Sequence, residues 1–120
     1  MKEKKQTYTI LCHNIDDKGK YTIAPREVTG SVIGFFGIHK EESLFHTTHI
    51  QSGLRICCGK NQSIQHRVVD HLIENYTDVF SCSTGNDVEK KLTSTDRNNL
   101  RLWLREIETQ EVWVEPPQRE

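Results

Sequence analysis

Apolar and polar positions change their period along the chain, and this change predicts the order of its elements. Before about residue 60 the runs suit strands, whereas later apolar positions recur every three or four residues, as in helices. The first helical stripe predicts an amphipathic helix from about Ser63 to Tyr76, and it comprises Ile64, Val68, Val69, Leu72, Ile73 and Tyr76. A second helix is expected after an N-cap at Ser94 or Thr95, with an inner stripe of Leu100, Trp103, Leu104 and Ile107.

Runs rich in β-branched and aromatic residues predict the strands. We expect strands at residues 7–13, 21–24, 28–39, 44–50, 54–58 and 111–114, a short extended segment at 77–82 and one helical turn at 87–92. Pro25 is expected to end the second strand, because proline cannot donate to a strand ladder. Gly30, Gly34 and Gly37 predict that the third is a bent strand, since each glycine would cost a helix about 1 kcal/mol. Together these elements predict an α+β fold, an antiparallel sheet of about five to six strands packed by two main α-helices.

Length and charge limit the class of protein. The 120 residues are expected to form a single domain, 1–120, with loose ends at 1–6 and 115–120. Sixteen basic and seventeen acidic residues give a net charge of −1, which argues against a dedicated binder of duplex nucleic acid. No apolar signal segment follows the charged start, and no apolar run approaches the roughly 20 residues that span a bilayer. We therefore expect a cytosolic protein with no membrane partner and with reduced cysteines.

Neither metal-binding nor catalytic motifs stand out. A zinc site drawn from His46, His49, Cys57, Cys58 and Cys82 is conceivable, but no C-x-x-C or H-x₃-H spacing supports it. The sequence also lacks the G-x-S-x-G, H-E-x-x-H and P-loop motifs. We therefore expect no metal, no cofactor and no catalytic residues, and predict a binding protein rather than an enzyme.

Arg55 and Phe80 offer recognition chemistry, each with a purely structural alternative. Arg55 interrupts an apolar strand, where it is either a solvated side chain or one that lies along a concave surface and binds phosphate or a base. Phe80 is either a core residue or a stacking face for a base. The polar loop that follows it, Ser81–Asp87, contains Asn86 and offers short hydrogen-bonding groups suited to ribose or phosphate.

Three arginines at four-residue steps form a basic ridge on the second predicted helix, and they are Arg97, Arg101 and Arg105. A solvated helix face would explain them. Guanidinium groups also suit phosphate, however, because they donate paired hydrogen bonds. Combined with Arg55 and Phe80, the ridge predicts recognition of a compact phosphorylated nucleotide.

The order of these elements resembles that of a known family. The segment Thr-Thr-His-Ile-Gln-Ser-Gly-Leu-Arg-Ile, residues 47–56, follows a glycine-broken strand and precedes an amphipathic helix, Phe80 and an arginine-bearing C-terminal helix. From about Thr7 to Glu108 this order resembles the first-described family of phage Thoeris anti-defence proteins. Members of that family are non-enzymatic sponges that bind cyclic ADP-ribose isomers made by bacterial TIR-domain proteins. Some members also hold cyclic oligonucleotides of the CBASS pathway at separate sites of an oligomer.

The resemblance implies a function, a location and a set of contacts. It implies that the chain sequesters a cyclic ADP-ribose isomer in the cytoplasm of an infected bacterial host, and so blocks TIR/Thoeris immunity. It further implies that Arg55 and Phe80 flank the base, and that Asn86 contacts ribose. Phosphate would meet Arg105 or Arg101. The family assembles through dimers with ligand between protomers, so a homo-oligomer is expected.

Two other functions stay open. One is an inhibitor, encoded by a phage or mobile element, that binds a host protein directly through the sheet edge or the acidic surface. Such a protein would show a protein partner and no small ligand. The other is a small enzyme that acts on cyclic nucleotides, which would return an altered ligand. The absence of a general base near the expected pocket argues against an enzyme, although the sequence does not place His46, His49 and His66.

Overall fold

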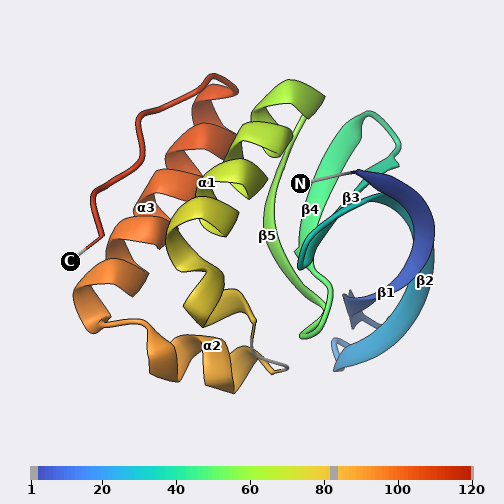
Figure 1. Ribbon diagram of the computed structural model, residues 1–120. Helices are drawn as coiled ribbons and strands as arrows, with labels where there is room; N and C mark the ends of the chain where they lie inside the picture. Colours follow the sequence, from blue (N-terminus) through green and yellow to red (C-terminus); the bar gives the residue numbers. More distant parts are fainter. Residues whose placement is uncertain (1–2, 82–83, 120) are drawn as a thin grey trace.

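An antiparallel sheet and a layer of helices form the fold of the computed structural model, which describes residues 3–81 and 84–119 (Figure 1). The strands are β1 (Lys4–Ile15), β2 (Tyr21–Ile33), β3 (Phe36–Glu41), β4 (Leu44–His49) and β5 (Leu54–Gly59). The helices are α1 (Gln62–Phe80), α2 (Gly85–Lys91) and α3 (Ser94–Gln110). The strands pair in the order β1-β2-β3-β4-β5. The predicted α+β fold, with an antiparallel sheet and two long helices, is confirmed.

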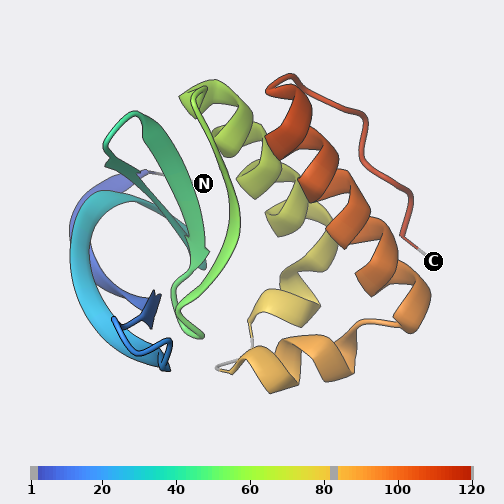
Figure 2. The same ribbon diagram turned by 180° about the vertical axis from the view of Figure 1, so that it is seen from behind.

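The sheet is strongly curled, because β1 and β2 leave the plane of the other strands. β2 pairs with β1 from Tyr21 to Val32, but with β3 only through residues Ser31–Ile33. Beyond that point the β1–β2 hairpin arches over one face of the sheet (Figure 2). It returns to the opposite edge, where the N–H of Leu11 donates to the carbonyl oxygen of Gly53, next to β5, at 3.1 Å. The sheet therefore almost closes on itself around a concave face.

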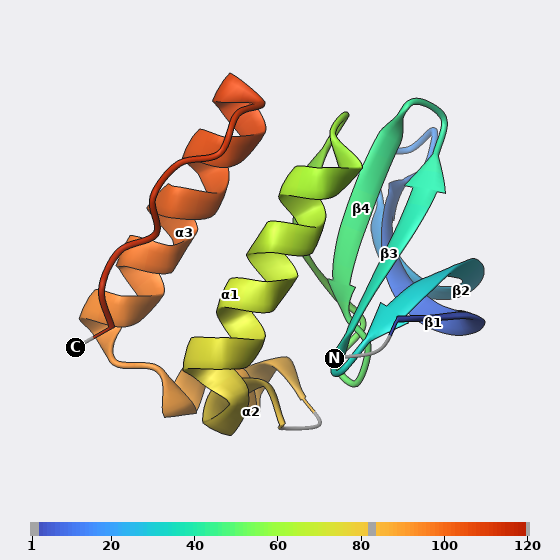
Figure 3. The ribbon, with the colours of Figure 1, turned by 45° about the horizontal axis from the view of Figure 1, so that its top comes forward.

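The two long helices lie on the other face of the sheet (Figure 3). α1 packs on β3, β4 and β5, and α3 lies against β5. Asn61 caps α1, because its side chain accepts from the N–H of Ile64 at 3.3 Å. Thr93 caps α3 in the same way, accepting from the N–H of Asp96 at 3.0 Å. The cap of α3 therefore lies one residue before Ser94 and two before Thr95, the two expected positions.

One core joins the helices to the sheet, and the predicted stripes face it. Its largest fully buried side chains include Tyr76, Phe36, Leu72 and Ile107. A hydrogen bond crosses this core, from Oγ1 of Thr47 in β4 to Oε1 of Gln65 in α1, at 2.6 Å. Thr47 and Gln65 are 0% and 1% exposed, so each satisfies a polar group that water cannot reach.

Pro25 does not end β2, contrary to the prediction that this strand stops at residue 24. It pairs with Leu11 in the middle of the hairpin. The N–H of Leu11 points away from β2, toward Gly53, so this is a non-hydrogen-bonded pair and β1 needs no donor from Pro25. On its other side Pro25 has no partner strand, because β3 pairs only with Ser31–Ile33. The missing N–H therefore breaks no ladder bond.

Residues 28–39 form parts of two strands, rather than the one bent strand that the glycines predicted. The chain reverses at Gly34, whose φ of 58° is a left-handed conformation that glycine adopts without steric cost. Gly30 marks a close approach of backbones instead, since a Cβ there would lie 2.2 Å from the carbonyl oxygen of Ile38. The spacing of the glycines predicted unusual backbone conformation or packing. It did not show that Gly34 forms a turn whereas Gly30 allows a close approach of two strands.

Residues 77–80 and 111–114 lack the extended structure expected of them. Val79 and Phe80 continue the buried stripe of α1, so the helix extends to Phe80. Trp113 lies in a tail without regular structure and packs edge-on against Trp103, with ring centroids 5.7 Å apart. The guanidinium of Arg67 lies 4.0 Å from the centroid of the same ring. The tail is thus held by aromatic contacts on the helices instead of by strand pairing.

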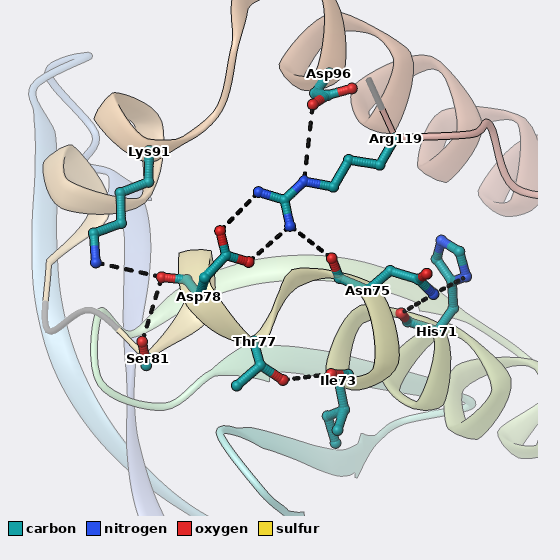
Figure 4. Close-up of polar contacts among 9 residues, drawn as sticks. All are labelled: His71, Ile73, Asn75, Thr77, Asp78, Ser81, Lys91, Asp96 and Arg119. Carbon is teal, nitrogen blue, oxygen red and sulfur yellow. Dashed lines mark hydrogen bonds and ion pairs between the residues drawn. The ribbon is translucent and has the colours of Figure 1, made fainter.

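Both expected loose ends contain residues that the fold holds. Lys4 already belongs to β1. Arg119 donates to both carboxylate oxygens of Asp78, at 2.7 and 2.8 Å, and to the carbonyl oxygen of Asn75 at 2.7 Å (Figure 4). Its Nε also lies 4.0 Å from the carboxylate of Asp96. One guanidinium therefore joins the tail to both α1 and α3.

Candidate functional site

The concave face of the curled sheet forms a cavity of about 640 Å³ to which all five strands contribute. Cavities of roughly 300–1,000 Å³ are typical of small-molecule sites. The polar part of its wall contains Arg26, His39, Glu41, His46, Thr48 and Arg55. The apolar part contains Ile10, Leu11 and Leu54. This combination of a large hollow with a few converging polar groups makes it the candidate site.

Strand alternation separates the cavity from the core along β4. His46 and Thr48 line the cavity. Thr47 and His49 lie between them in sequence and bond to α1 on the other face. His46 and His49 therefore point to opposite faces of the sheet, and the two histidines cannot bind one ligand together.

A bulge in β5 brings Arg55 into the cavity. Thr47 pairs with Cys57 and Thr48 pairs with Arg55, so Ile56 has no partner in β4. In a regular strand, residues 55 and 57 would share a face. The extra residue instead places Cys57 in the core, where it is 0% exposed, and Arg55 on the cavity wall.

An ion pair links β2 to β3 where the two strands have separated. Nη1 and Nη2 of Arg26 donate to the two carboxylate oxygens of Glu41 at 2.5 and 2.6 Å. These hydrogen bonds lower the pKa of Glu41. Because the two side chains are 45% and 41% exposed, the pair contributes little to overall stability and serves mainly to position the arching hairpin.

Two histidine rings stack inside the cavity. The ring centroids of His39 and His46 are 5.1 Å apart, and the ring planes differ by 20°. His39 is only 4% exposed, and its Nδ1 lies 3.5 Å from the hydroxyl of Tyr8. Its buried Nε2 has no hydrogen-bond partner among residues 3–81 and 84–119, and lies 3.8 Å from Oε2 of Glu41. Burial lowers the pKa of both rings, and the charge of Arg55 lowers that of His46 further, so both are neutral near pH 7.

Arg55 keeps its positive charge available to a ligand. Its Nη1 contacts Sγ of Cys58 at 3.5 Å. No carboxylate within the described ranges 3–81 and 84–119 lies at ion-pair distance from it. Arg26, by contrast, is held by Glu41. With neutral histidines, two arginines and one glutamate give the wall a formal charge of +1, which favours an anion.

Phe80 lies on the opposite side of the sheet from the cavity. It is 5% exposed, and its ring centroid lies 5.1 Å from that of Phe36 and 5.3 Å from that of His49. Phe80 is therefore a core residue, which is the structural alternative that its sequence context left open. The structure does not bring its ring together with Arg55 in one chain.

The other three predicted ligand residues also lie away from the cavity. Asn86 is exposed in α2 and lines a separate hollow of about 360 Å³ together with Arg97. Arg101 and Arg105 are exposed on α3, in the helical layer. Of the five predicted residues, only Arg55 lines the cavity of the sheet.

Sequence reasoning missed Arg26, His39 and Glu41. Arg26 and Glu41 meet only because the β1–β2 hairpin arches over the sheet. No local sequence pattern predicts this curvature. His39 could have been found, since Glu41 pairs with Leu44 across a two-residue turn, and that register sets His39 opposite His46. Two histidines on one face of one hairpin were the available signal.

The cysteines and histidines form no metal site in the described part of the chain. No group of three or more His, Cys, Asp or Glu there could hold a metal ion. Cys12, Cys57 and Cys58 are free thiols, and burial raises the pKa of Cys57 to about 12. Cys82 of the zinc hypothesis and Ser83 of the polar loop lie outside the described residues.

Comparison with known proteins leaves the cavity as the main guide to function. No protein family, no curated protein sequence and no solved structure matches the chain. Among the helices that the structure describes, none has both the length and the apolar character needed to cross a membrane.

Proposed function

We propose that this protein binds a small phosphorylated nucleotide in the cavity of its curled sheet and holds it without changing it. The observation that carries the proposal is Arg55, a guanidinium that faces a cavity of about 640 Å³ and contacts only the sulfur of Cys58 at hydrogen-bond distance among the described side chains. A guanidinium in such a position donates paired hydrogen bonds to phosphate.

The rest of the wall suits the other parts of a nucleotide. Ile10 and Leu54, which are 8% and 39% exposed, offer an apolar surface for a base. Thr48 and His46 lie beside Arg55 and offer hydrogen-bonding groups for ribose hydroxyls. A base, a ribose and a phosphate would each meet a matching part of the wall.

The resemblance to the Thoeris anti-defence sponges supports a cyclic ADP-ribose isomer as the ligand, with cyclic oligonucleotides as a second class. In this proposal the protein acts in the cytoplasm of an infected bacterial host and lowers the concentration of the free signal by mass action. A sponge must bind well below the working concentration of its signal. Nanomolar affinity, about −12 kcal/mol, meets that need.

Self-association completes the proposed site. Within one chain Asn86, Arg101 and Arg105 lie in the helical layer, away from the cavity. In a homodimer or larger oligomer, the helical layer of a second protomer would cover the mouth of the cavity and bring these side chains to the ligand. Closure between protomers would also remove water from the phosphate contacts and strengthen them.

Retention of ligand tests the proposal. Purified protein is incubated with cyclic ADP-ribose isomers and freed of unbound ligand, then heat-denatured, and the released material is analysed. We expect intact ligand in stoichiometric amount from the native chain and a loss of at least tenfold in affinity for Arg55→Gln. Lys60→Gln, a change of an exposed lysine outside the cavity, is the matched control. Altered ligand would identify an enzyme instead, and no retained ligand would reject the proposal.

An exposed apolar cluster favours a second candidate, an inhibitor that binds a host protein. Ile15, Tyr21 and Ile23, at the end of the β1–β2 hairpin, are 72%, 57% and 54% exposed. Apolar side chains grouped at a protruding hairpin are typical of protein contacts. Capture of one host protein by the native chain, lost in Ile15→Ser and Ile23→Ser and unaffected by Arg55→Gln, would favour this function over nucleotide binding.

A further inference from the structure

The stacked histidines are buried polar groups of the cavity that the proposed phosphate contact does not use. His39 is only 4% exposed, yet its Nε2 has no hydrogen-bond partner in the part of the chain that the structure describes. His46 stacks on it and lines the same cavity. A buried nitrogen that lacks a partner costs free energy unless it gains one in another state of the protein. A bound ligand is one such state.

The charges around the pair come from every element packed against it. Tyr8 of β1 reaches Nδ1 of His39, and burial raises the pKa of its hydroxyl to about 12, so it stays protonated. Glu41 of β3, Arg26 of β2, Arg55 of β5 and Glu108 of α3 act electrostatically on one or both rings. Cys12 of β1 lines the same cavity. Because Glu41 is already committed to two hydrogen bonds from Arg26, it compensates an extra positive charge on the rings only in part.

We propose that the cavity takes up one proton when it binds a phosphate-bearing ligand, and that the stacked pair His39–His46 accepts it. This inference rests on the proposed function, because it needs an anion in the cavity. Burial is the main cause that lowers the pKa of His46, and the positive charge of Arg55 lowers it further; a phosphate beside Arg55 would offset this second contribution. With the pair protonated, Nε2 of His39, which has no hydrogen-bond partner among the described residues, can donate to the ligand.

The geometry limits the uptake to one proton. Two imidazolium rings with centroids 5.1 Å apart would repel each other strongly in a partly dry cavity, so the pair titrates as a unit. Linkage then gives the size of the effect. If the ligand raises the pKa of the pair by about one unit, the dissociation constant falls about tenfold between a pH above the bound value and a pH below the free value.

Proton uptake also gives the site a means of discrimination. A phosphate group both accepts the new hydrogen bond and stabilises the added charge, whereas an uncharged nucleoside does neither. The cavity would therefore bind cyclic ADP-ribose more tightly as the pH falls, while adenosine would bind weakly and with little dependence on pH. The histidine pair thus acts as a specificity element for anions and not as a catalytic group.

Calorimetric titration of the full chain with cyclic ADP-ribose tests this inference. Titrations at about pH 5.5 and about pH 7.5, each in two buffers that differ in ionisation enthalpy, give both the affinity and the number of protons taken up. We expect a net uptake of up to about half a proton per ligand, largest at a pH between the free and bound pKa values, and an affinity that is higher at the lower pH by up to about tenfold. His46→Gln, which replaces a half-buried ring, should remove the proton uptake and most of the pH dependence. Any uptake left in the His39→Gln,His46→Gln variant belongs to the ligand itself.

His66→Gln provides the matched control, since His66 lies on α1 outside the cavity. It should keep both the proton uptake and the pH dependence of the native chain. Equal affinity at both pH values without proton uptake would overturn this inference and leave the proposed function in place. Uptake that persists unchanged in both His46→Gln and the double variant would also overturn it. Absence of binding at either pH would reject the proposed function together with this inference.

Discussion

His49 Nε2 lies 2.6 Å from the carbonyl oxygen of Phe80, and this hydrogen bond joins the centre of the sheet to the end of α1. The carbonyl oxygen can only accept, so Nε2 carries the ring proton. Nδ1 is then the acceptor for the hydroxyl of Ser52, 2.8 Å away. A neutral imidazole with both nitrogens satisfied is thus buried at 1% exposure. A residue that the sequence marked as a possible metal ligand or general base instead holds the two layers together.

Replacing this imidazole should destabilise the fold. His49→Leu would leave the Phe80 carbonyl oxygen buried without a donor, and we expect the free energy of unfolding to fall by about 2–3 kcal/mol. Ser52→Ala removes only one partner of the ring, so a loss of about 1 kcal/mol is expected. Urea denaturation followed by circular dichroism measures both. A His49→Leu variant as stable as the native chain would show that the bond between the layers contributes nothing.

Stability should fall as the pH drops below about 6.5. Burial lowers the pKa of His49 in the folded state, so the unfolded chain binds the proton more readily. The stability that neutral His49 provides is therefore complete above the unfolded pKa and is lost as the pH falls below it. At about pH 5.5 this single group can remove at most about 1.4 kcal/mol. The pKa values of buried His39 and half-buried His71 shift in the same direction.

Urea midpoints at about pH 7.5 and about pH 5.5 measure this effect. His49→Leu should show a smaller difference between the two midpoints than the native chain, whatever its absolute stability. His66→Gln serves as the control. Native midpoints that coincide at the two pH values would contradict the expectation.

Binding and stability should respond to different residues. Arg55→Gln changes an exposed side chain of the cavity, so we expect weaker retention of cyclic ADP-ribose with an unchanged melting temperature. Phe80→Leu changes the core, so we expect a loss of about 1–2 kcal/mol in stability with unchanged affinity for the fraction that folds. Isothermal titration and thermal melts on the same preparations separate the two effects. Weaker binding by folded Phe80→Leu would restore Phe80 as a ligand contact.

Arg119 should stabilise the helical layer. Arg119→Ala removes a two-pronged ion pair with Asp78 and a hydrogen bond to the Asn75 carbonyl oxygen. Because Asp78 is 63% exposed, we expect a modest loss of about 1 kcal/mol. Arg119 lowers the pKa of Asp78, so this contribution is present above the ordinary aspartate pKa and disappears as the pH falls through the lowered value.

Arg119→Lys keeps the positive charge but cannot form the paired hydrogen bonds to Asp78. Its free energy of unfolding should therefore lie between those of the native chain and Arg119→Ala. Chemical denaturation near neutral pH and in acid measures these differences. If Arg119→Ala had the same urea midpoint as the native chain, the contacts of Arg119 with Asp78 and Asn75 would contribute nothing measurable to stability.

Gly37 should tolerate no side chain. A Cβ there would lie 2.4 Å from Cζ of Tyr8 and so would clash with the ring of Tyr8. The hydroxyl of this ring contacts His39. We expect Gly37→Ala to cost about 1–3 kcal/mol through displacement of that ring, and to weaken any ligand contact made by His39. Gly59→Ala is the comparison, because its Cβ would meet only the amide end of Gln65 at 3.3 Å and should cost less. Equal losses in the two variants would contradict this steric explanation.

Periodicity predicted most of the fold but little of the candidate site, for a physical reason. The stripe from Ile64 to Tyr76 is a local signal, since residues three and four apart meet within one helix. The extension of α1 to Phe80 was missed, because a β-branched and aromatic pair suits a strand as well as a helix. The passage of β2 through Pro25 was missed because it depends on which edge of the strand lacks a partner.

The cavity depends on curvature, and curvature is not local. Arg26 meets Glu41 only where the hairpin arches over the sheet, and the bulge at Ile56 sets the direction of Arg55. Arg55 could be proposed from sequence because a charged residue within an apolar run needs an explanation. Asn86 was proposed from the resemblance, and the structure sets it in a different layer.

The alternation along β4 has a consequence for how such a protein can diversify. Residues 46 and 48 face the cavity, whereas residues 47 and 49 hold the sheet to α1. Under the proposed function, exchanges at the first pair would alter what the cavity accepts without disturbing the bonds made by the second. Selection for a new ligand and selection for a stable fold would therefore act on alternate residues of β4. A lineage that faces a changing repertoire of small molecules can follow it without rebuilding its core.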